Sequence, residues 1–210
     1  MTRSPGSDDS VLEHVAANAP NGYRREVLLA IVDLLTDQHR GQQALDFGCG
    51  DGWFASSLGQ LRVASDLVPL EVERRTRSYV EPVLYDGRRI PYRDRTFDLV
   101  YAVDVLHHCD DPAAVLSDLM RVCSDLLLIK DHTWSSRTER GLLIALDELG
   151  NRRFGVRSPH RYQHGWEWIP QIEAEFNRIE LIHPFACNTQ PIIRRLTPQV
   201  QWIGLWRRRP

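Results

Sequence analysis

Residues 44–54 read Ala44-Leu45-Asp46-Phe47-Gly48-Cys49-Gly50-Asp51-Gly52-Trp53-Phe54. A short apolar run ends in an acid, glycines follow at positions 48, 50 and 52, and a further apolar segment begins at Trp53. This order predicts a strand, a tight turn and an opening helix. Glycine has no Cβ, so the backbone of such a turn can approach a ligand closely. We therefore expect a nucleotide-cofactor site at this turn.

The glycine spacing and the neighbouring charges narrow the class of cofactor. The pattern is G-x-G-x-G, whereas dinucleotide-binding folds use G-x-G-x-x-G and seat a pyrophosphate on the N-terminus of the helix. Asp46 and Asp51 flank the turn with negative charge. Carboxylates there would repel a pyrophosphate and would suit a ligand that carries an ammonium and a sulfonium. The alternative, a turn that binds no ligand, explains the glycines but not the acids that follow the later strands.

Four segments in order resemble the class I S-adenosylmethionine-dependent methyltransferases of the small-molecule type. They are residues 45–52 (LDFGCGDG), 64–66 (ASD), 85–87 (YDG) and 97–108 (FDLVYAVDVLHH). Their combination is specific for the cofactor and not for the acceptor. The resemblance implies S-adenosyl-L-methionine as the cofactor. It also implies an α/β fold with a Rossmann-like, doubly wound, seven-stranded and mostly parallel sheet, an antiparallel C-terminal hairpin, and helices on both faces.

Polar residues are expected where the strands end. After the first strand we predict strands at residues 61–65, 82–85, 97–103 and 126–129. The polar residues at or just after the strand ends are Asp46, Asp66, Asp86, His107 and Asp131. In open α/β sheets the ligand crevice lies outside the carboxyl ends of the strands, so these side chains should converge. Asp66 lies twenty positions after Asp46 (66 minus 46), near the distance at which such sheets place an acid on a ribose diol.

The resemblance also assigns the cofactor contacts, which would come from Asp46, Gly48, Cys49, Gly50, Asp66, Leu67, Asp86, Gly87, Val103 and His107. In the family, an acid in the place of Asp86 accepts the adenine amino proton, and the amide of the next residue donates to the ring. Asp66 would accept hydrogen bonds from both ribose hydroxyls.

At 210 residues the chain fits one domain. We divide it into an N-terminal helical cap (1–40), a cofactor-binding core (41–131), an acceptor lid insertion (132–176) and a C-terminal strand hairpin (177–210). Residues 1–9 are expected to be frayed. Helices are predicted at 10–19, 23–37, 68–78, 112–123 and 138–149, the last ended by Gly150, and in part of 166–176. The final strands are predicted at 179–183 and 201–205, with residues 207–209 as a solubilising tail.

Residues 151–166 are rich in arginine, histidine and aromatic residues, and a loop of this composition favours a functional role. Arg152, Arg153, Arg157 and Arg161 lie in a stretch that has no acid before Glu167. Guanidinium groups match carboxylates and phosphates. We therefore expect a lid over an acceptor that carries an anionic group, such as a nucleotide-linked sugar or another phosphorylated metabolite. A solvated basic loop is the alternative.

Methyl transfer to a hydroxyl group needs a base that removes the proton. Residues 104–107 read Asp-Val-Leu-His, whereas the family's nucleic-acid N-methylating members have a motif like Asn-Pro-Pro-Tyr at this place. Because this nitrogen-acceptor motif is absent, an oxygen acceptor is favoured. His132 and His164 are the first choices for the base and Asp131 is the third. His108 and His160 are further candidates, whereas His107 is expected to contact the cofactor.

His160 and His164 have the i, i+4 spacing of a metal pair. Pro159 and Gly165 argue against a helix at this place, so no metal site is predicted.

Charge and composition exclude several partners. The net charge of −2 and the pI of about 6.4 leave no global electrostatic footprint for nucleic acid. The first ten residues do not resemble a signal peptide, and no run of roughly 18 apolar residues could span a membrane. The four cysteines lack close pairing and fit free thiols in a reducing compartment. We therefore expect a cytoplasmic protein without a membrane partner, and its oligomeric state is left open.

Two other function classes remain open. The chain could bind S-adenosylmethionine without methyl transfer and act as a scaffold or regulator. It could also be an NAD-dependent dehydrogenase on a related sheet, although the glycine spacing and the C-terminal hairpin count against this class. Cofactor binding without transfer to any acceptor would identify the first alternative.

Overall fold

The computed structural model describes residues 5–36, 43–151, 159–197 and 199–210. The segment 152–158 of the predicted lid, with Arg152, Arg153 and Arg157, therefore lies outside the described residues.

A single mixed sheet runs through the molecule in the order β3-β2-β1-β4-β5-β8-β7, and β6 pairs with β5 off this path. The parallel strands of the main path are β1 (Gln43–Phe47), β2 (Asp66–Glu71), β3 (Val83–Leu84), β4 (Phe97–Val103) and β5 (Cys123–Trp134). The antiparallel strands are β8 (Gln201–Arg208), which pairs with β5, and β7 (Phe176–Ile182), which pairs with β8. The predicted fold class, including the C-terminal hairpin, is confirmed. The short β6 (Gln163–His164) adds an eighth strand to the seven predicted.

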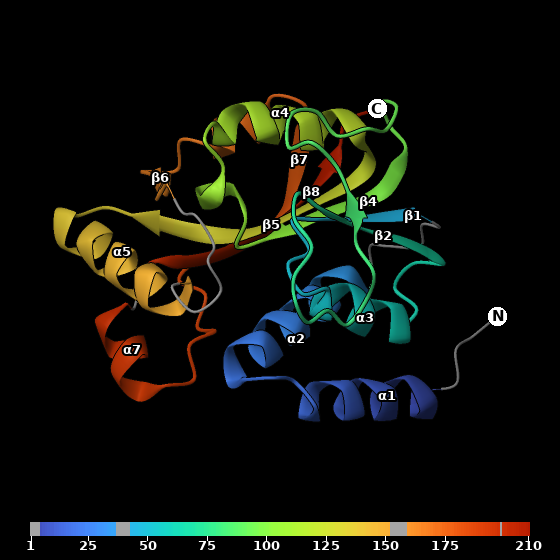
Figure 1. The fold of residues 1–210 in the computed structure, drawn as a ribbon, viewed down its shortest axis with the longest axis horizontal. Helices are drawn as coiled ribbons and strands as arrows, with labels where there is room; N and C mark the ends of the chain where they lie inside the picture. The colour runs from blue at the N-terminus through green and yellow to red at the C-terminus, as the bar shows by residue number, and fades with distance from the viewer. Residues whose placement is uncertain (1–4, 37–42, 152–158, 198) are drawn as a thin grey trace.

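Helices cover both faces of the sheet, as Figure 1 shows. On one face lie α1 (Pro5–Ala17), α2 (Gly22–Thr36) and α3 (Trp53–Gln60), and on the other lies α4 (Pro112–Val122). The short α6 (Ile169–Glu173) contacts α4. Beyond the end of the sheet lie α5 (Arg137–Asn151) and α7 (Pro191–Leu196). The 3-10 helix η1 (Leu106–His108) joins β4 to α4.

The apolar core has two layers because β4 and β5 are covered on both sides. On the α4 side, Leu127 and Ile129 of β5 join one buried cluster, and on the α2 side Leu126 and Leu128 join another. Helix α2 buries Val27, Leu28, Ile31 and Leu35 in the second cluster. The predicted start of α4 is also confirmed, because Asp111 Oδ1 accepts a hydrogen bond from the Ala114 amide at 3.0 Å and Pro112 follows the cap.

The segment after α3 differs from its prediction. The strand predicted at 61–65 and the helix predicted at 68–78 are wrong: β2 spans Asp66–Glu71, and the described chain forms neither helix nor strand between Glu71 and Val83. Proline has no N–H to donate to a neighbouring strand. Pro69 is tolerated inside β2 because the pairing with β3 begins only at Leu70.

Four smaller boundaries also differ. Residues 5–9, predicted as frayed, belong to α1, and Gly150 lies within α5 instead of ending it. Strand β5 continues to Trp134, so Asp131 and His132 are strand residues and the sheet passes the predicted core boundary at residue 131. Arg207 and Arg208 are residues of β8 and not a tail, and the Arg208 guanidinium lies 4.6 Å from the centre of the Phe176 ring.

Candidate functional site

The turn between β1 and α3 requires its glycines. Gly48, Gly50 and Gly52 have φ values of 67°, 59° and 73°. Residues with a side chain rarely adopt positive φ values. A Cβ on Gly48 would lie 2.5 Å from Val105 Cγ1, whereas a Cβ on Gly50 would meet no described atom within 4 Å. The backbone at Gly50 therefore faces open space, which a ligand could fill.

Two carboxylates lie against this turn. Glu71, the last residue of β2, accepts hydrogen bonds through Oε2 from the Gly50 amide at 2.9 Å and through Oε1 from the Val72 amide at 2.8 Å. Asp46 is buried, and its Oδ2 has no hydrogen-bond partner among the residues that the structure describes. Burial raises the pKa of Asp46 to about 7, and the Glu71 charge adds to this rise. An ammonium group would satisfy the unpaired oxygen of Asp46.

Two of the predicted cofactor residues lie elsewhere. Asp66 is exposed and is the first residue of β2, where it pairs with Gln43 at the amino end of β1. Leu67 pairs with Ala44 and packs in the cluster on the α2 side. The parallel register thus places Glu71 beside the glycine turn, and not Asp66. The signal in the sequence was the acid that ends the apolar run of residues 67–70.

Two further predicted cofactor residues follow β3. Asp86 and Gly87 are exposed, and Asp86 Oδ1 accepts a hydrogen bond from the Arg88 amide at 3.0 Å. Gly87 has a φ of 74°, and a Cβ on it would lie 3.3 Å from Val72 Cγ1. The side chain of Val72 is apolar yet the residue is 53% exposed. This apolar surface, with a carboxylate beside it, suits a flat heteroaromatic ring.

The end of β4 is tied to α2 by a buried polar network. Asp104 directly follows Val103, the last residue of β4, and accepts a hydrogen bond through Oδ2 from the Tyr23 hydroxyl at 2.6 Å. Its Oδ1 accepts from the fully buried Lys130 ammonium, which also donates to Gln201 Oε1 at 2.6 Å. Burial opposes ionisation, but Lys130 holds the pKa of Asp104 below its usual value. The network fixes α2 over the end of the sheet.

Asp131 holds the segment that follows β4. Its Oδ1 lies 2.6 Å from His107 Nδ1 and accepts from the His132 amide at 2.7 Å, and its Oδ2 accepts from the Leu106 amide at 3.0 Å. Burial acts against ionisation, but His107 holds the pKa of Asp131 well below its usual range. Asp131 is therefore an ionised acceptor whose oxygens are already in use, so it positions its neighbours and is poorly placed as a base.

Histidines and an aspartate gather next to Asp131. His132 Nδ1 lies 3.4 Å from Asp131 Oδ1 and 3.6 Å from Asp104 Oδ1. Burial and the nearby Lys130 lower the pKa of His132. The ring of Tyr162 stacks on that of His107 at 4.9 Å between centres. The remaining members are His108, His160 and Asp147 of α5. The sequence had indicated the histidines of this cluster and Asp131 as candidate site residues, but not Asp147.

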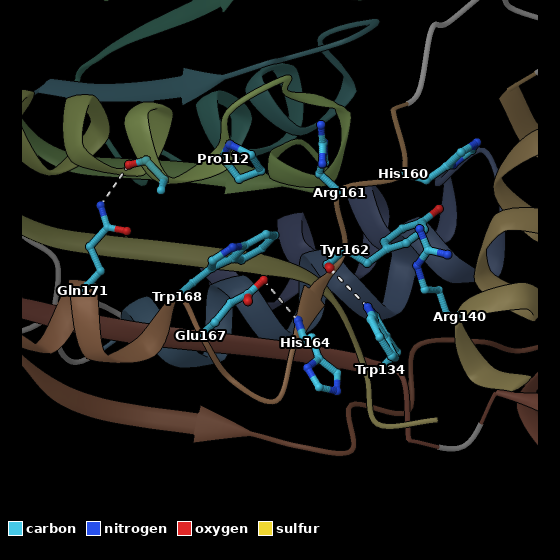
Figure 2. A pocket seen from close by; sticks show the side chains of 11 residues that line it. Pro112, Trp134, Arg140, His160, Arg161, Tyr162, His164, Glu167, Trp168 and Gln171 are labelled. Carbon is cyan, nitrogen blue, oxygen red and sulfur yellow. Dashed lines mark hydrogen bonds between the residues drawn. The ribbon is translucent and has the colours of Figure 1, made fainter. Parts of the chain in front are cut away.

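A cavity of about 550 Å³ opens beside this cluster (Figure 2). Its walls are Pro112, Ala113, Trp134, Arg140, His160, Arg161, Tyr162, His164, Glu167, Trp168 and Gln171. His164, a predicted base, lines this cavity, and its ring lies 4.1 Å from that of Trp134. His160 and Tyr162 line the cavity and also contact the histidine cluster. The described end of the predicted lid, residues 159–166, thus forms one wall of the cavity.

Known proteins resemble this chain in sequence and fold. Residues 45–125 match the family model described as a methyltransferase domain. The malonyl-[acyl-carrier protein] O-methyltransferase of Serratia marcescens is 35% identical over 89 residues, which are 40% of this chain and 35% of that protein. The protein of the same name from Yersinia pestis is 33% identical over 121 residues, or 55% and 43%. The matches thus span less than half the length of these curated relatives.

The fold comparison agrees with the sequence comparison. The crystal structure of an S-adenosylmethionine-dependent methyltransferase from Aquifex aeolicus superposes with a TM-score of 0.60 at 14% identity, covering 97% of this chain and 99% of that one. Within the described ranges, no helix is long and apolar enough to cross a lipid bilayer. Residues 45–125 thus resemble a methyltransferase domain, and the whole chain has the fold seen in the Aquifex aeolicus structure.

Proposed function

We propose that this chain transfers the methyl group of S-adenosyl-L-methionine to an oxygen atom of a small-molecule acceptor that carries an anionic group. The observation that carries the proposal is the acidic, open glycine turn. Gly50 faces open space, Asp46 Oδ2 lacks a partner among the described residues, and Glu71 lies against the turn. This combination favours a cationic ligand with hydroxyl groups over a pyrophosphate.

The cofactor assignment follows the carboxyl ends of four strands. Asp46 and the backbone of Gly48 and Cys49 would bind the ammonium end of the cofactor. Glu71 replaces Asp66 as the acid for the ribose diol, since it ends β2 beside Gly50. Asp86 and Gly87 would contact the adenine, with Val72 against the ring face. Val103 ends β4 and borders the same edge of the sheet.

The cavity of Figure 2 is the acceptor site in this proposal. Trp134 and Trp168 supply apolar walls, and Arg140 and Arg161 supply positive charge. Mostly apolar walls with a few placed polar groups are typical of small-molecule sites. The named relatives are O-methyltransferases, which supports an oxygen acceptor.

The main role of the protein in this reaction is to place the acceptor oxygen in line with the methyl group. The acceptor oxygen attacks the methyl carbon in line, the carbon–sulfur bond breaks, and S-adenosylhomocysteine leaves. Orientation and exclusion of water supply much of the rate, and a hydroxyl acceptor also gives up its proton to a base. His132, next to the end of β4, and His164, in the cavity, are the two candidates.

Methyl-labelled S-adenosyl-L-methionine and a panel of acceptors test the proposal. Each acceptor would be supplied in pairs that differ only in a phosphate or carboxylate group, and transfer would be followed by mass spectrometry. We expect the anionic member of a pair to be methylated with the lower KM. Tight binding of S-adenosylhomocysteine without transfer to any acceptor would support a binding protein instead. Preference for neutral acceptors would reject the anionic-group part alone.

A further inference from the structure

Two adjacent histidines of η1 and one aspartate of α5 point ligand atoms at one place. His107 Nε2 and His108 Nε2 each lie 3.9 Å from Asp147 Oδ1. The three ligand atoms lie within 4.8 Å of one another. A separation of 3.9 Å is too long for a hydrogen bond. It is near the spacing of two atoms that bind one metal ion, because ligands about 2.0–2.2 Å from a metal lie roughly 3–4 Å apart.

We propose that His107, His108 and Asp147 bind a divalent transition-metal ion. Two imidazoles and one carboxylate suit Zn²⁺, Fe²⁺, Co²⁺ or Mn²⁺ and leave coordination positions open. This proposal concerns the side-chain cluster itself and does not depend on methyl transfer.

Groups behind His107 and Asp147 hold these two ligands in place. The Asp131 carboxylate lies 2.6 Å from His107 Nδ1, so this nitrogen is engaged and Nε2 faces Asp147. A carboxylate behind a histidine is the usual partner of a metal ligand. His160 Nδ1 lies 3.1 Å from Asp147 Oδ2, and His160 Nε2 lies 3.1 Å from Glu148. These contacts leave Asp147 Oδ1 turned toward the two histidines.

His108 turns Nε2 toward Asp147 Oδ1. Its Nδ1 is buried without a hydrogen-bond partner among the described residues.

The sequence pointed away from this site because it offered a different pair. His160 and His164 have metal spacing but separate in the structure: His160 faces Asp147 and Glu148, and His164 stacks near Trp134. Asp147 lies 39 positions after His108 (147 minus 108), which matches no local spacing. A second possible group, His107 with Asp131 and His132, is less suitable because three hydrogen bonds already occupy Asp131.

The cluster adjoins the wall of the cavity. Arg161 donates its amide to the His107 carbonyl at 3.0 Å, which holds the cavity wall formed by residues 160–162 against η1.

Metal binding by the chelator-treated full chain tests the proposal directly. Co²⁺ titration should give visible absorption bands that saturate at one ion per chain, and Zn²⁺ should displace the Co²⁺. His108→Gln and Asp147→Asn should each weaken Co²⁺ binding by at least about tenfold, while the matched control His14→Gln, on exposed α1, leaves it unchanged. Circular dichroism would confirm that each variant is folded.

A measurement on the wild-type chain covers the case in which a variant fails to fold. X-ray absorption of the Co²⁺ or Zn²⁺ complex should show two imidazole ligands. Saturating titrations without binding of Co²⁺, Zn²⁺, Mn²⁺ or Fe²⁺ would overturn the proposal and leave the cluster as a proton-sharing network. Equal binding by the wild type and both variants, or a bound ion without imidazole ligands, would overturn it as well.

Discussion

Glu71 Oε2 accepts a hydrogen bond from the amide of Gly50 at 2.9 Å, and this contact places the acid of β2 against the glycine turn of β1. Asp66, five positions earlier, is exposed at the opposite end of the same strand. The pairing of Phe47 with Leu70 fixes this arrangement, because the residue after Leu70 must then lie level with the turn. Glu71, and not Asp66, is therefore the acid of β2 that lies beside the glycine turn.

Glu71→Gln is expected to weaken S-adenosylhomocysteine binding by about 10- to 100-fold, since a charge-assisted hydrogen bond contributes roughly 1.5–3 kcal/mol. The matched control is Asp66→Asn, which removes an acid from the same strand at its other end and should leave the affinity unchanged. Isothermal titration calorimetry measures both. The reverse order of effects would restore Asp66 as the ribose ligand.

Gly50→Ala should affect both the stability of the fold and the binding of the cofactor. The φ of 59° should cost about 1–2 kcal/mol of folding free energy for a residue with a Cβ. The added methyl group points into open space and should also block the cofactor. Gly59→Ala in α3 is the control. The added Cβ would meet no described atom within 4 Å, and alanine should stabilise the helix by about 0.5–1 kcal/mol. A Gly50→Ala protein that binds the cofactor normally would contradict the placement.

The buried carboxyl of Asp46 predicts a pH-dependent stability of the ligand-free protein. Its pKa rises from 3.8 to about 7 on folding, so between these values the folded chain holds a proton that the unfolded chain has lost. The free energy of unfolding therefore falls as the pH rises through this window. Asn at position 46 cannot ionise, so Asp46→Asn removes this pH dependence. Its free energy of unfolding relative to the wild type should therefore be about 2 kcal/mol higher at pH 8 than at pH 5, at roughly 1.4 kcal/mol per pKa unit.

Urea unfolding at the two pH values measures this gain. The exposed Asp66→Asn protein shows what the loss of one surface charge contributes. An Asp46→Asn protein whose stability relative to the wild type is the same at pH 5 and pH 8 would show that Asp46 keeps an ordinary pKa.

Local sequence predicted the parts of the site that local physics decides. The glycine turn followed from residues that tolerate positive φ, and the start of α4 followed from Asp111 and Pro112. Asp66 was expected beside the turn and lies at the other end of β2, because strand register depends on pairing between distant residues, here Gln43 with Asp66. The position of Asp147 beside η1 depends on how α5 packs, and no spacing in the chain encodes that contact.

His132 and His164 can be separated by kinetics. His132 lies 3.6 Å from Asp104, the residue after β4, whereas His164 lines the cavity. We expect His132→Gln to lower kcat by about 10²–10⁴ with cofactor affinity unchanged, as removal of a base would do. His164→Gln should mainly raise the acceptor KM. If neither variant changes the rate by more than a few-fold, the enzyme works by positioning alone.

Arg140 and Arg161 carry the prediction of an anionic acceptor, because the other arginines of the predicted lid, at 152, 153 and 157, lie outside the described residues. Both line the cavity, and both are exposed. Arg140→Gln and Arg161→Gln should each raise the acceptor KM several-fold. This increase in KM should be smaller at high salt, because dissolved ions weaken the attraction between exposed charges, with a screening length of about 10 Å at 0.1 M. Arg137→Gln is the control on α5, since Arg137 is exposed and is not part of the cavity wall. Initial rates at two ionic strengths, with cofactor affinity measured in parallel, decide the matter. Unchanged acceptor kinetics in both cavity variants would mean that these arginines are only a solvated basic surface.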